Sequence, residues 1–293
     1  MNGIAVLNKP KGKTSHDMIS VCRKIFGTRR VGHTGTLDPN ATGVLPICVG
    51  NATKASQYIM DSKKRYTAQL ILGRKTDTLD CTGTVTQIGN IDVSRDVLCE
   101  ACSRFLGEIS QIPPMYSAVK VNGKKLYEYA RSGAEVERKP RKVNIYSIDV
   151  LDYDEDKGFG EIEIVCSKGT YIRTLCDDIG EYLGCYAHMG ELVRTYSGGF
   201  DISQSRTVEE LCKLGESGNA EKALMATDSV FSQYDALYLS EGETLKVKNG
   251  VPIVRKDTEE NKTYRLYDEN GGFLCVSRQT DGKLKMLTSF WTD

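Results

Sequence analysis

Asp38 is the residue best placed to do chemistry, because it is the single acid of a glycine- and proline-rich stretch in a basic part of the chain. The stretch spans residues 32–46 and reads GHTGTLDPNATGVLP. Its glycines and prolines exclude a regular helix, and Pro39 biases Asp38 toward an extended backbone, so we expect the carboxylate on a loop. Cationic surroundings favour an ionised carboxyl, which suits a nucleophile or a stabiliser of positive charge. The pattern points to chemistry on a nucleic acid, although a plain turn-former is the alternative for an Asp before Pro.

Charge is segregated along the chain, although the formal net charge is +0. Residues 1–75 contain 13 Lys or Arg against 3 Asp or Glu, a net of +10, and residues 76–293 therefore carry a net of −10. A second basic stretch, residues 120–142, holds 8 basic and 3 acidic residues. Because phosphate binding needs a positive field, these two regions are candidate RNA-binding surfaces. The alternative for each is an ordinary solvated face.

The elements that must position Asp38 are a mixture of helices and strands. Met18, Val21, Cys22 and Ile25 recur at helical spacing and predict a helix over residues 14–26, capped by Thr14. Strands are predicted over 66–73, 143–153 and 160–172, with helices over 94–106 and from about 173 to 183. No regular βαβ repeat is present, so the fold class predicted is α+β, with a mixed, largely antiparallel sheet flanked by helices.

A second, smaller domain is predicted after a turn-rich boundary between Gly215 and Gln233. Beyond it, short apolar runs alternate with Gly, Asn and Asp turns, which is typical of a small β domain. We therefore divide the chain into residues 1–230 and 231–293.

Composition limits compartment and cofactors. The ten cysteines are scattered singly, mostly within apolar runs, as expected for core residues in a reducing compartment. Cys99 and Cys102 have metal-site spacing but no second pair, and both are expected on the buried face of a helix. Residues 152–158 resemble a calcium loop with a misplaced glycine and fit a hairpin turn better. No apolar stretch reaches the roughly 20 residues of a membrane span, so a cytoplasmic protein without bound metal is expected.

Several blocks of the chain, in order, resemble the TruB family of tRNA pseudouridine synthases. The longest is the Asp38 stretch itself. The others are residues 7–10 (LNKP) with 14–16 (TSH), 64–66 (KRY), 74–80 (RKTDTLD), 113–118 (PPMYSA) and 167–173 (SKGTYIR). The resemblance covers at least residues 3–200, and Asn249 to Pro252 weakly resembles the opening of the PUA-type RNA-binding module of that family.

The resemblance implies a pseudouridine synthase fold with a C-terminal PUA-like β domain. It also implies an isomerase that converts uridine 55 in the T loop of tRNA to pseudouridine. The reaction cuts the N1–C1' bond, turns the base and joins C5 to C1', so it needs no cofactor. The sequence has no Walker-type phosphate loop and no dinucleotide-binding fingerprint. A monomer acting on the T arm of tRNA is expected.

The resemblance also assigns roles to particular residues. Asp38 is the catalytic acid, Arg173 its ion-pair partner, and Tyr66 the aromatic face and hydroxyl beside the uracil. His33 is expected to fill the gap left by the flipped base, since unstacking a base costs a few kcal/mol. The remaining substrate-binding positions are Lys9, Pro10, Asp80, Tyr171 and Leu192. Without the resemblance, Arg173 is a surface arginine, His33 a structural histidine, and Tyr66, Tyr171 and Leu192 ordinary core residues.

Two other functions were weighed. One is a tRNA-binding folding chaperone that acts without chemistry, which would have no need of Asp38, Tyr66 and Arg173 together. The other is a glycoside hydrolase, disfavoured because no second acid candidate stands beside Asp38.

Overall fold

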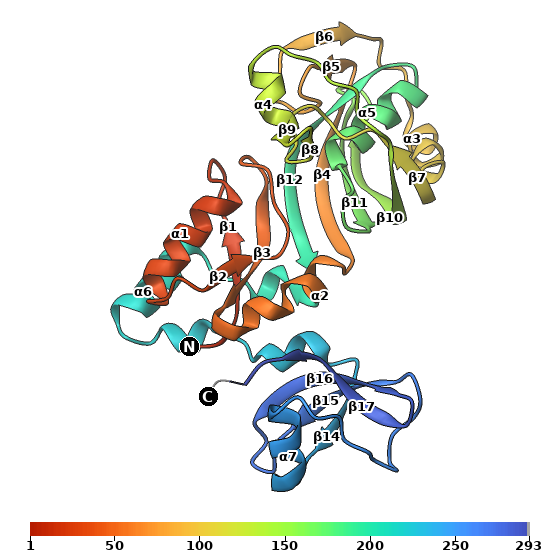
Figure 1. The fold of residues 1–293 in the computed structure, drawn as a ribbon. Helices are drawn as coiled ribbons and strands as arrows, with labels where there is room; N and C mark the ends of the chain where they lie inside the picture. The colour runs from red at the N-terminus through yellow and green to blue at the C-terminus, as the bar shows by residue number, and fades with distance from the viewer. Residues whose placement is uncertain (292–293) are drawn as a thin grey trace.

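The structure is a computed structural model that describes residues 1–291. A nine-stranded sheet runs through its larger part in the order β1-β3-β12-β4-β11-β10-β7, with β2 beside β3 and β13 beside β12 (Figure 1). All neighbouring strands are antiparallel except β12 and β3, which run parallel. The strands are β1 (Gly3–Lys9), β2 (Val31–His33), β3 (Thr42–Val49), β4 (Lys64–Leu72), β7 (Gly107–Gln111), β10 (Arg141–Asp154), β11 (Phe159–Cys166), β12 (Ala187–Ser197) and β13 (Phe200–Asp201). The predicted mixed, largely antiparallel sheet is confirmed.

Helices flank this sheet at both ends (Figure 1). α1 (Ser15–Ile25) and α6 (Val208–Glu216) pack together over β1 and β2, whereas α3 (Arg95–Ser103) and α5 (Ile172–Tyr182) pack over β10 and β12. The smaller elements of this part are α2 (Ser56–Met60), α4 (Leu126–Arg131), the hairpins β5–β6 (Arg74–Thr76, Val85–Ile88) and β8–β9 (Lys120–Val121, Lys124–Lys125), and the 3-10 turns η1 (Gly50–Ala55), η2 (Ile202–Gln204), η3 (Ala220–Ala223) and η4 (Thr227–Phe231).

Local sequence signals account for the ends of the main helices. The predicted N-terminal cap of α1 is confirmed: the Thr14 side chain caps the helix and also forms a capping box with Asp17. α5 ends before Gly184, which has a φ of +72° that glycine adopts at little cost. Among residues 1–291, no helix is long and apolar enough to cross a membrane.

Two local predictions are wrong. The strand expected over 160–172 ends at Cys166, because the Ser167–Tyr171 segment turns away and its Gly169 has a φ of +81°. Arg173 therefore lies in the first turn of α5 instead of ending a strand. In α3, Cys102 is buried but Cys99 is exposed, so the two cysteines do not share the core-facing side of the helix.

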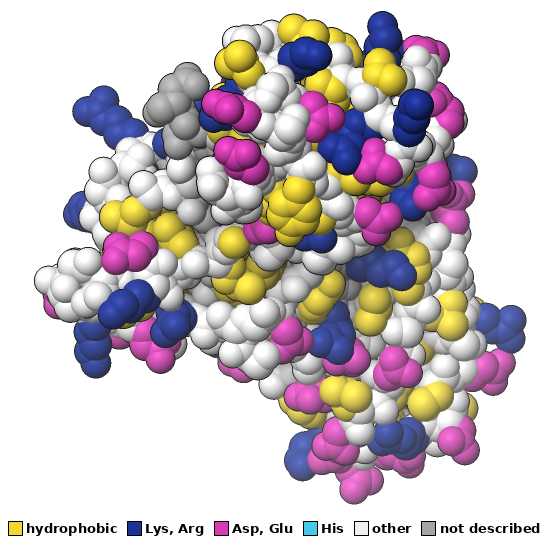
Figure 2. Space-filling view, turned by 90° about the horizontal axis from the view of Figure 1, so that it is seen from below, with side chains coloured by type: hydrophobic (Ala, Val, Ile, Leu, Met, Phe, Trp, Pro, Cys, Tyr) yellow, Lys and Arg dark blue, Asp and Glu magenta, His cyan; other side chains and the backbone are white. Residues whose placement is uncertain are grey.

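The C-terminal β domain is present below the large sheet (Figure 1). Its sheet has the order β14-β15-β16-β17, and the domain also contains α7. The bounds are β14 (Asp235–Tyr238), α7 (Glu241–Lys248), β15 (Thr263–Tyr267), β16 (Phe273–Thr280) and β17 (Lys283–Ser289). On the face seen from below, basic and acidic side chains are interspersed (Figure 2).

An apolar cluster joins the two parts of the molecule. Phe231, Val276 and Phe290 pack against Ala55 of η1. Beside this cluster, the buried Asn51 side chain donates to the carbonyl of Trp291 at 2.8 Å and to that of Phe290 at 3.3 Å. These hydrogen bonds hold the end of the described chain against η1, which follows β3.

Candidate active site

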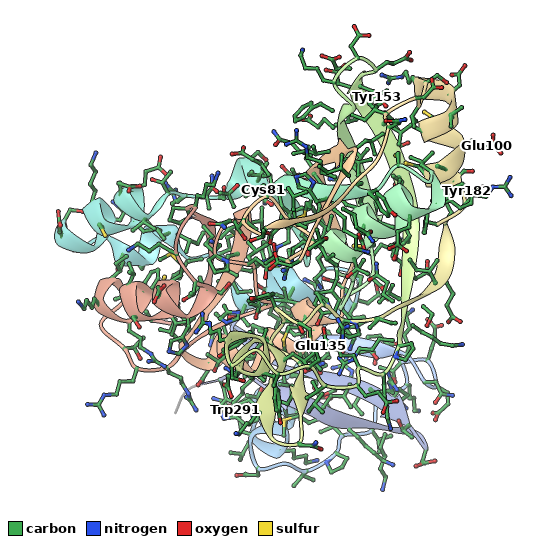
Figure 3. The ribbon with its side chains drawn as sticks, turned by 90° about the horizontal axis from the view of Figure 1, so that it is seen from above. Cys81, Glu100, Glu135, Tyr153, Tyr182 and Trp291 are labelled. Carbon is green, nitrogen blue, oxygen red and sulfur yellow. The ribbon has the colours of Figure 1, made fainter. Side chains whose placement is uncertain are left out.

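Two cavities meet around Asp38, in the middle of the large sheet. Their volumes are about 580 and 960 Å³, and both are lined by Asp38, Arg173 and Leu192. The smaller cavity extends past Tyr66 and Tyr171, and the larger one extends past His33, Asp80 and the α4 segment. Cys81 also lines the larger cavity, and its label marks this region near the middle of the view in Figure 3.

The Asp38 loop is anchored on both sides of the carboxylate. The Ser15 hydroxyl, at the start of α1, accepts a hydrogen bond from the Leu37 amide at 2.9 Å. The Lys9 amine, at the end of β1, donates to the Pro39 carbonyl at 3.0 Å. The residues before and after Asp38 are therefore fixed by two different elements, which defines where its side chain points.

Arg173 pairs with Asp38 across the cavity. Its Nη2 lies 3.0 Å from Asp38 Oδ2, and its Nη1 lies 3.5 Å from Asp80 Oδ2. The guanidinium, which is only 5% exposed, also donates to the carbonyls of Tyr116 at 2.9 Å and Thr78 at 3.3 Å. Four oxygen partners hold its plane, so the carboxylate of Asp38 meets a charged donor in a fixed orientation.

The pKa of the Asp38 carboxyl is shifted in the direction opposite to the one expected from its basic neighbours. Burial raises the pKa of its carboxyl above the ordinary value, and the nearby Asp80 adds to this rise, although Arg173 and Lys9 lower the pKa. The expectation that cationic surroundings favour the ionised carboxyl is therefore wrong, because the effect of burial is larger. Because 41% of the Asp38 side chain is exposed, the anion remains accessible to solvent. A carboxylate with a raised pKa is the more basic and the stronger nucleophile once ionised.

Tyr66 lies on β4, where the alternating burial of the strand turns its ring inward. It is 9% exposed and lines the smaller cavity together with Leu192 of β12. Burial raises the pKa of its hydroxyl, so the phenol is neutral near pH 7. Tyr171, directly before α5, lines the same cavity, and its backbone is held by the side chain of the buried Gln111. Nothing in the sequence alone singled out Gln111.

His33 and Asp80 lie on the side of the larger cavity. Burial and the Arg194 charge lower the pKa of His33, so its ring is neutral near pH 7, as suits stacking on an uncharged base. Asp80 Oδ1 accepts from the Thr78 hydroxyl and the Thr82 amide, which leaves Oδ2 facing Arg173.

Two of the expected substrate-binding residues lie elsewhere. Lys9 is 0% exposed, and its amine donates to three carbonyls behind the Asp38 loop, including that of Lys13 at 2.6 Å. Pro10 is exposed, and neither residue lines a cavity. A role of this pair in substrate binding stays a prediction, and the hydrogen bond from Lys9 to Pro39 supports the Asp38 loop. Within residues 1–291, no three His, Cys, Asp or Glu side chains are grouped so as to hold a metal ion.

The sequence also missed Arg194 of β12, which lines the smaller cavity and is only 1% exposed. Its Nε donates to the Val44 carbonyl at 2.8 Å and its Nη2 to the Gly35 carbonyl at 3.2 Å. A buried arginine on a strand is unusual, and a lone arginine within an apolar strand was the only signal that could have drawn attention to it.

Known protein families account for most of the chain. Residues 23–172 match the profile described as TruB family pseudouridylate synthase, N-terminal domain, and residues 173–231 match that of the tRNA pseudouridylate synthase B C-terminal domain. The chain belongs to the TruB family of pseudouridylate synthases, and it is therefore an isomerase.

Full-length relatives support the same conclusion. The tRNA pseudouridine synthase B of Clostridium kluyveri is 42% identical over 294 residues, which cover 99% of this chain and 100% of that one. The enzyme of the same name from Alkaliphilus oremlandii is 48% identical over 250 residues, or 85% of this chain and 82% of the relative. Among solved structures, a chain of a Cbf5-Nop10-Gar1 complex superposes with a TM-score of 0.73 at 25% identity and covers 99% of this chain and 85% of that one.

Proposed function

We propose that the protein converts uridine 55 in the T loop of tRNA to pseudouridine, with Asp38 as the catalytic acid. The observation that carries the proposal is the 3.0 Å pair of Asp38 and Arg173 inside a cavity that Tyr66 also lines. The tRNA substrate is supported by the name shared by the relatives, and the T-loop position by the blocks that resemble the family.

The reaction follows from the positions of three side chains. The ionised Asp38 adds to the flipped nucleotide, the N1–C1' bond breaks with its electron pair remaining on the uracil, and the base turns within the cavity. C5 then bonds to C1', the bond to Asp38 breaks and its electron pair returns to the carboxylate. The neutral Tyr66 hydroxyl gives its own proton to N1 of the turned uracil and takes the proton that C5 loses. Arg173 keeps the carboxylate ionised and oriented for the first step. Leu192 and Tyr171 form walls that hold the detached base.

A uridine in a folded loop must leave its stack before it can reach Asp38. Unstacking costs a few kcal/mol, which the protein has to offset. We propose that the neutral His33 ring takes the place of the flipped base. In support, His33 lines the larger cavity, on the side of the site away from Tyr66.

Basic side chains around the cavities supply the attraction for RNA. Lys125 and Arg131 both lie over the ring of Tyr127, with 5.3 Å between each cationic group and the ring centre, and all three line the larger cavity. Arg141 and Lys142 line the smaller one. The basic stretch 120–142 therefore borders both cavities, where a phosphate backbone next to the flipped nucleotide would lie.

We propose that residues 1–230 form the catalytic domain and residues 231–293 a PUA-like RNA-binding domain. We also propose that the protein acts as a cytoplasmic monomer. Seven of its ten free cysteines are buried, which fits a reducing compartment. Light scattering of the protein with and without tRNA tests the monomer, since a complex of twice the expected protein mass contradicts it.

The test of function is incubation with unmodified tRNA, followed by chemical mapping of pseudouridine. We expect modification at one T-loop uridine, and none when that uridine is replaced by cytidine. Asp38→Asn should bind tRNA without making product. A protein that binds and refolds tRNA but leaves every uridine unmodified would instead be a folding chaperone, and the proposed chemistry would be rejected.

A further inference from the structure

Arg194 is a buried cation without an acidic partner. No carboxylate of residues 1–291 lies within 4.0 Å of its guanidinium, whereas Arg173 pairs with two. Its identified partners are the carbonyls of Val44 and Gly35. Burying a charge without a counter-charge is costly, so the position calls for a reason beyond packing.

The backbone of β12 brings Arg194 to Tyr66. The two residues are direct cross-strand partners in the β12–β4 ladder, and side chains directly opposite one another in a ladder share one face of the sheet. Both line the smaller cavity. On its other side, β12 approaches β3 so closely that a Cβ on Gly43 would lie 2.3 Å from the Arg194 carbonyl. Only glycine, here at a φ of +101°, permits this approach.

The charged and titratable groups around Tyr66 come from three elements. They are Arg194 of β12, Cys166 of β11 and Asp38 of the loop. Burial raises the pKa of Tyr66, and Cys166 and Asp38 add to the rise. Arg194 is the one group among the three that lowers this pKa, chiefly through its charge. Besides that of Tyr66, the charge of Arg194 lowers the pKa values of Lys9, His33, Lys64 and Cys166.

We propose that Arg194 is the positioning residue of Tyr66. Held by two carbonyls on its far side, its guanidinium fixes the phenol at the cavity wall and favours negative charge on the hydroxyl oxygen. The hydroxyl can then give its own proton to N1 of the turned uracil and take the one released from C5. The buried cation thus stabilises negative charge at the atom where an anion must form. This inference rests on the proposed role of Tyr66 in the reaction.

The experiment is a titration of tyrosine labelled with carbon-13 at Cζ, followed by NMR in the absence of RNA. The Tyr66 signal is assigned as the one lost in Tyr66→Phe. In Arg194→Met we expect this signal to titrate about one pH unit higher than in the wild type, because one nearby positive charge is lost. Arg194→Gln removes the charge but keeps donors for the carbonyls, so it gives the same reading if the methionine variant does not fold. Arg194→Lys should return the titration most of the way.

Lys64→Met is the matched control. Lys64 is also a buried cation at the smaller cavity, and it also donates to backbone carbonyls, those of Ile59, Met60 and Ser62. It is not among the largest influences on the pKa of Tyr66, so its loss should reduce stability and shift the Tyr66 titration much less than the loss of Arg194 does. An unshifted Tyr66 signal in folded Arg194→Met or Arg194→Gln overturns the proposal. So does an equal shift in Lys64→Met.

Catalysis gives an independent reading. With tRNA carrying tritium at C5 of uridine, Arg194→Met should slow tritium release at pH 7 by about tenfold and move the pH profile of the rate upward with the NMR titration. If Tyr66→Phe keeps the wild-type rate of release, the proposed role of Tyr66 fails, yet the electrostatic link between Arg194 and Tyr66 stands on the titration alone. If the titration moves and the pH profile does not, the link exists without consequence for the reaction and the positioning role is rejected.

Discussion

Arg173→Met tests the ion pair on which the proposed chemistry depends. The substitution removes the charge 3.0 Å from Asp38 and 3.5 Å from Asp80. It keeps an apolar side chain of similar length at this buried position. Burial already raises the pKa of Asp38 above its ordinary value, and Arg173 is the largest influence that lowers it. Without Arg173 the pKa must rise further, because two carboxyls then share a site with no cation between them.

The size of the rise follows from the geometry. Since 41% of the Asp38 side chain is exposed, an effective dielectric constant between those of a protein surface and of water applies. With a value of about 40, a unit charge at 3.0 Å contributes about 2.8 kcal/mol, or about two pKa units. Rearrangement of water reduces this, so we expect the acid limb of the pH–rate profile to move upward by one to two units, roughly. The plateau rate should fall about 100-fold because orientation of the carboxylate is also lost.

The assay is single-turnover tritium release with enzyme in excess over tRNA, from pH 4.5 to 9. Arg65→Met is the matched control: Arg65 also faces two carboxylates, Asp201 at 2.9 Å and Glu163 at 3.9 Å, but lines neither cavity. Its loss should leave the acid limb where it is. An Arg173→Met profile whose acid limb coincides with that of the wild type would refute the reasoning, whatever happens to the plateau.

Three further predictions concern the fold and the RNA. Asp38→Asn should melt no lower than the wild type. Because the fold raises the pKa of this carboxyl, the ionised side chain destabilises the native state at pH 7, and a neutral side chain removes this destabilisation. A drop of several degrees in Tm contradicts the prediction. In urea unfolding, Gly43→Ala should lower the free energy of unfolding by about 3 kcal/mol, because its Cβ would meet the β12 backbone at a φ of +101°. Gly12→Ala, at a φ of +81° in open space, should lower it by about 1 kcal/mol. Equal losses reject the packing argument. Replacing Lys125 and Arg131 by glutamine should reduce the slope of log K for tRNA against log salt concentration by about 1.5. The same replacement of the exposed Arg104 and Lys157 should leave this slope unchanged. Identical slopes for the two double variants place the RNA elsewhere.

The sequence predicts those parts of the site that depend on local rules. The capping box at Thr14 defined the start of α1, and the glycines and Pro39 defined a loop at Asp38. The motif blocks indicated Asp38, Tyr66 and Arg173 as partners, and the structure places all three at one cavity. These signals lie within a few residues of the features that they predict.

What the sequence could not predict depends on strand register between distant segments. The parallel pairing of β12 with β3 joins Arg194 to Gly43, and no local pattern encodes a pairing over 150 residues. The same holds for Lys9, which the family resemblance assigned to substrate binding and whose amine the fold places against the Pro39 carbonyl of the Asp38 loop. The pKa of Asp38 was misjudged for a related reason, since burial is a property of the assembled fold and not of neighbouring letters.

The position of β12 should make the site sensitive to backbone changes that touch no reacting atom. This strand lies between β3, which follows the Asp38 loop, and β4, which carries Tyr66, and it supplies Leu192 itself. Asp38 and Tyr66 therefore keep their relative positions only while β12 remains in register with both neighbours. A change such as Gly43→Ala, which forces β3 and β12 apart, should lower the rate of a molecule that is still folded, because a displacement of about 1 Å between carboxylate and tyrosine is enough to cost two orders of magnitude. Activity should consequently decline at urea concentrations below those that unfold the sheet, and in Gly43→Ala by more than in Gly12→Ala. Coincident loss of activity and structure in both variants would show that β12 contributes stability alone.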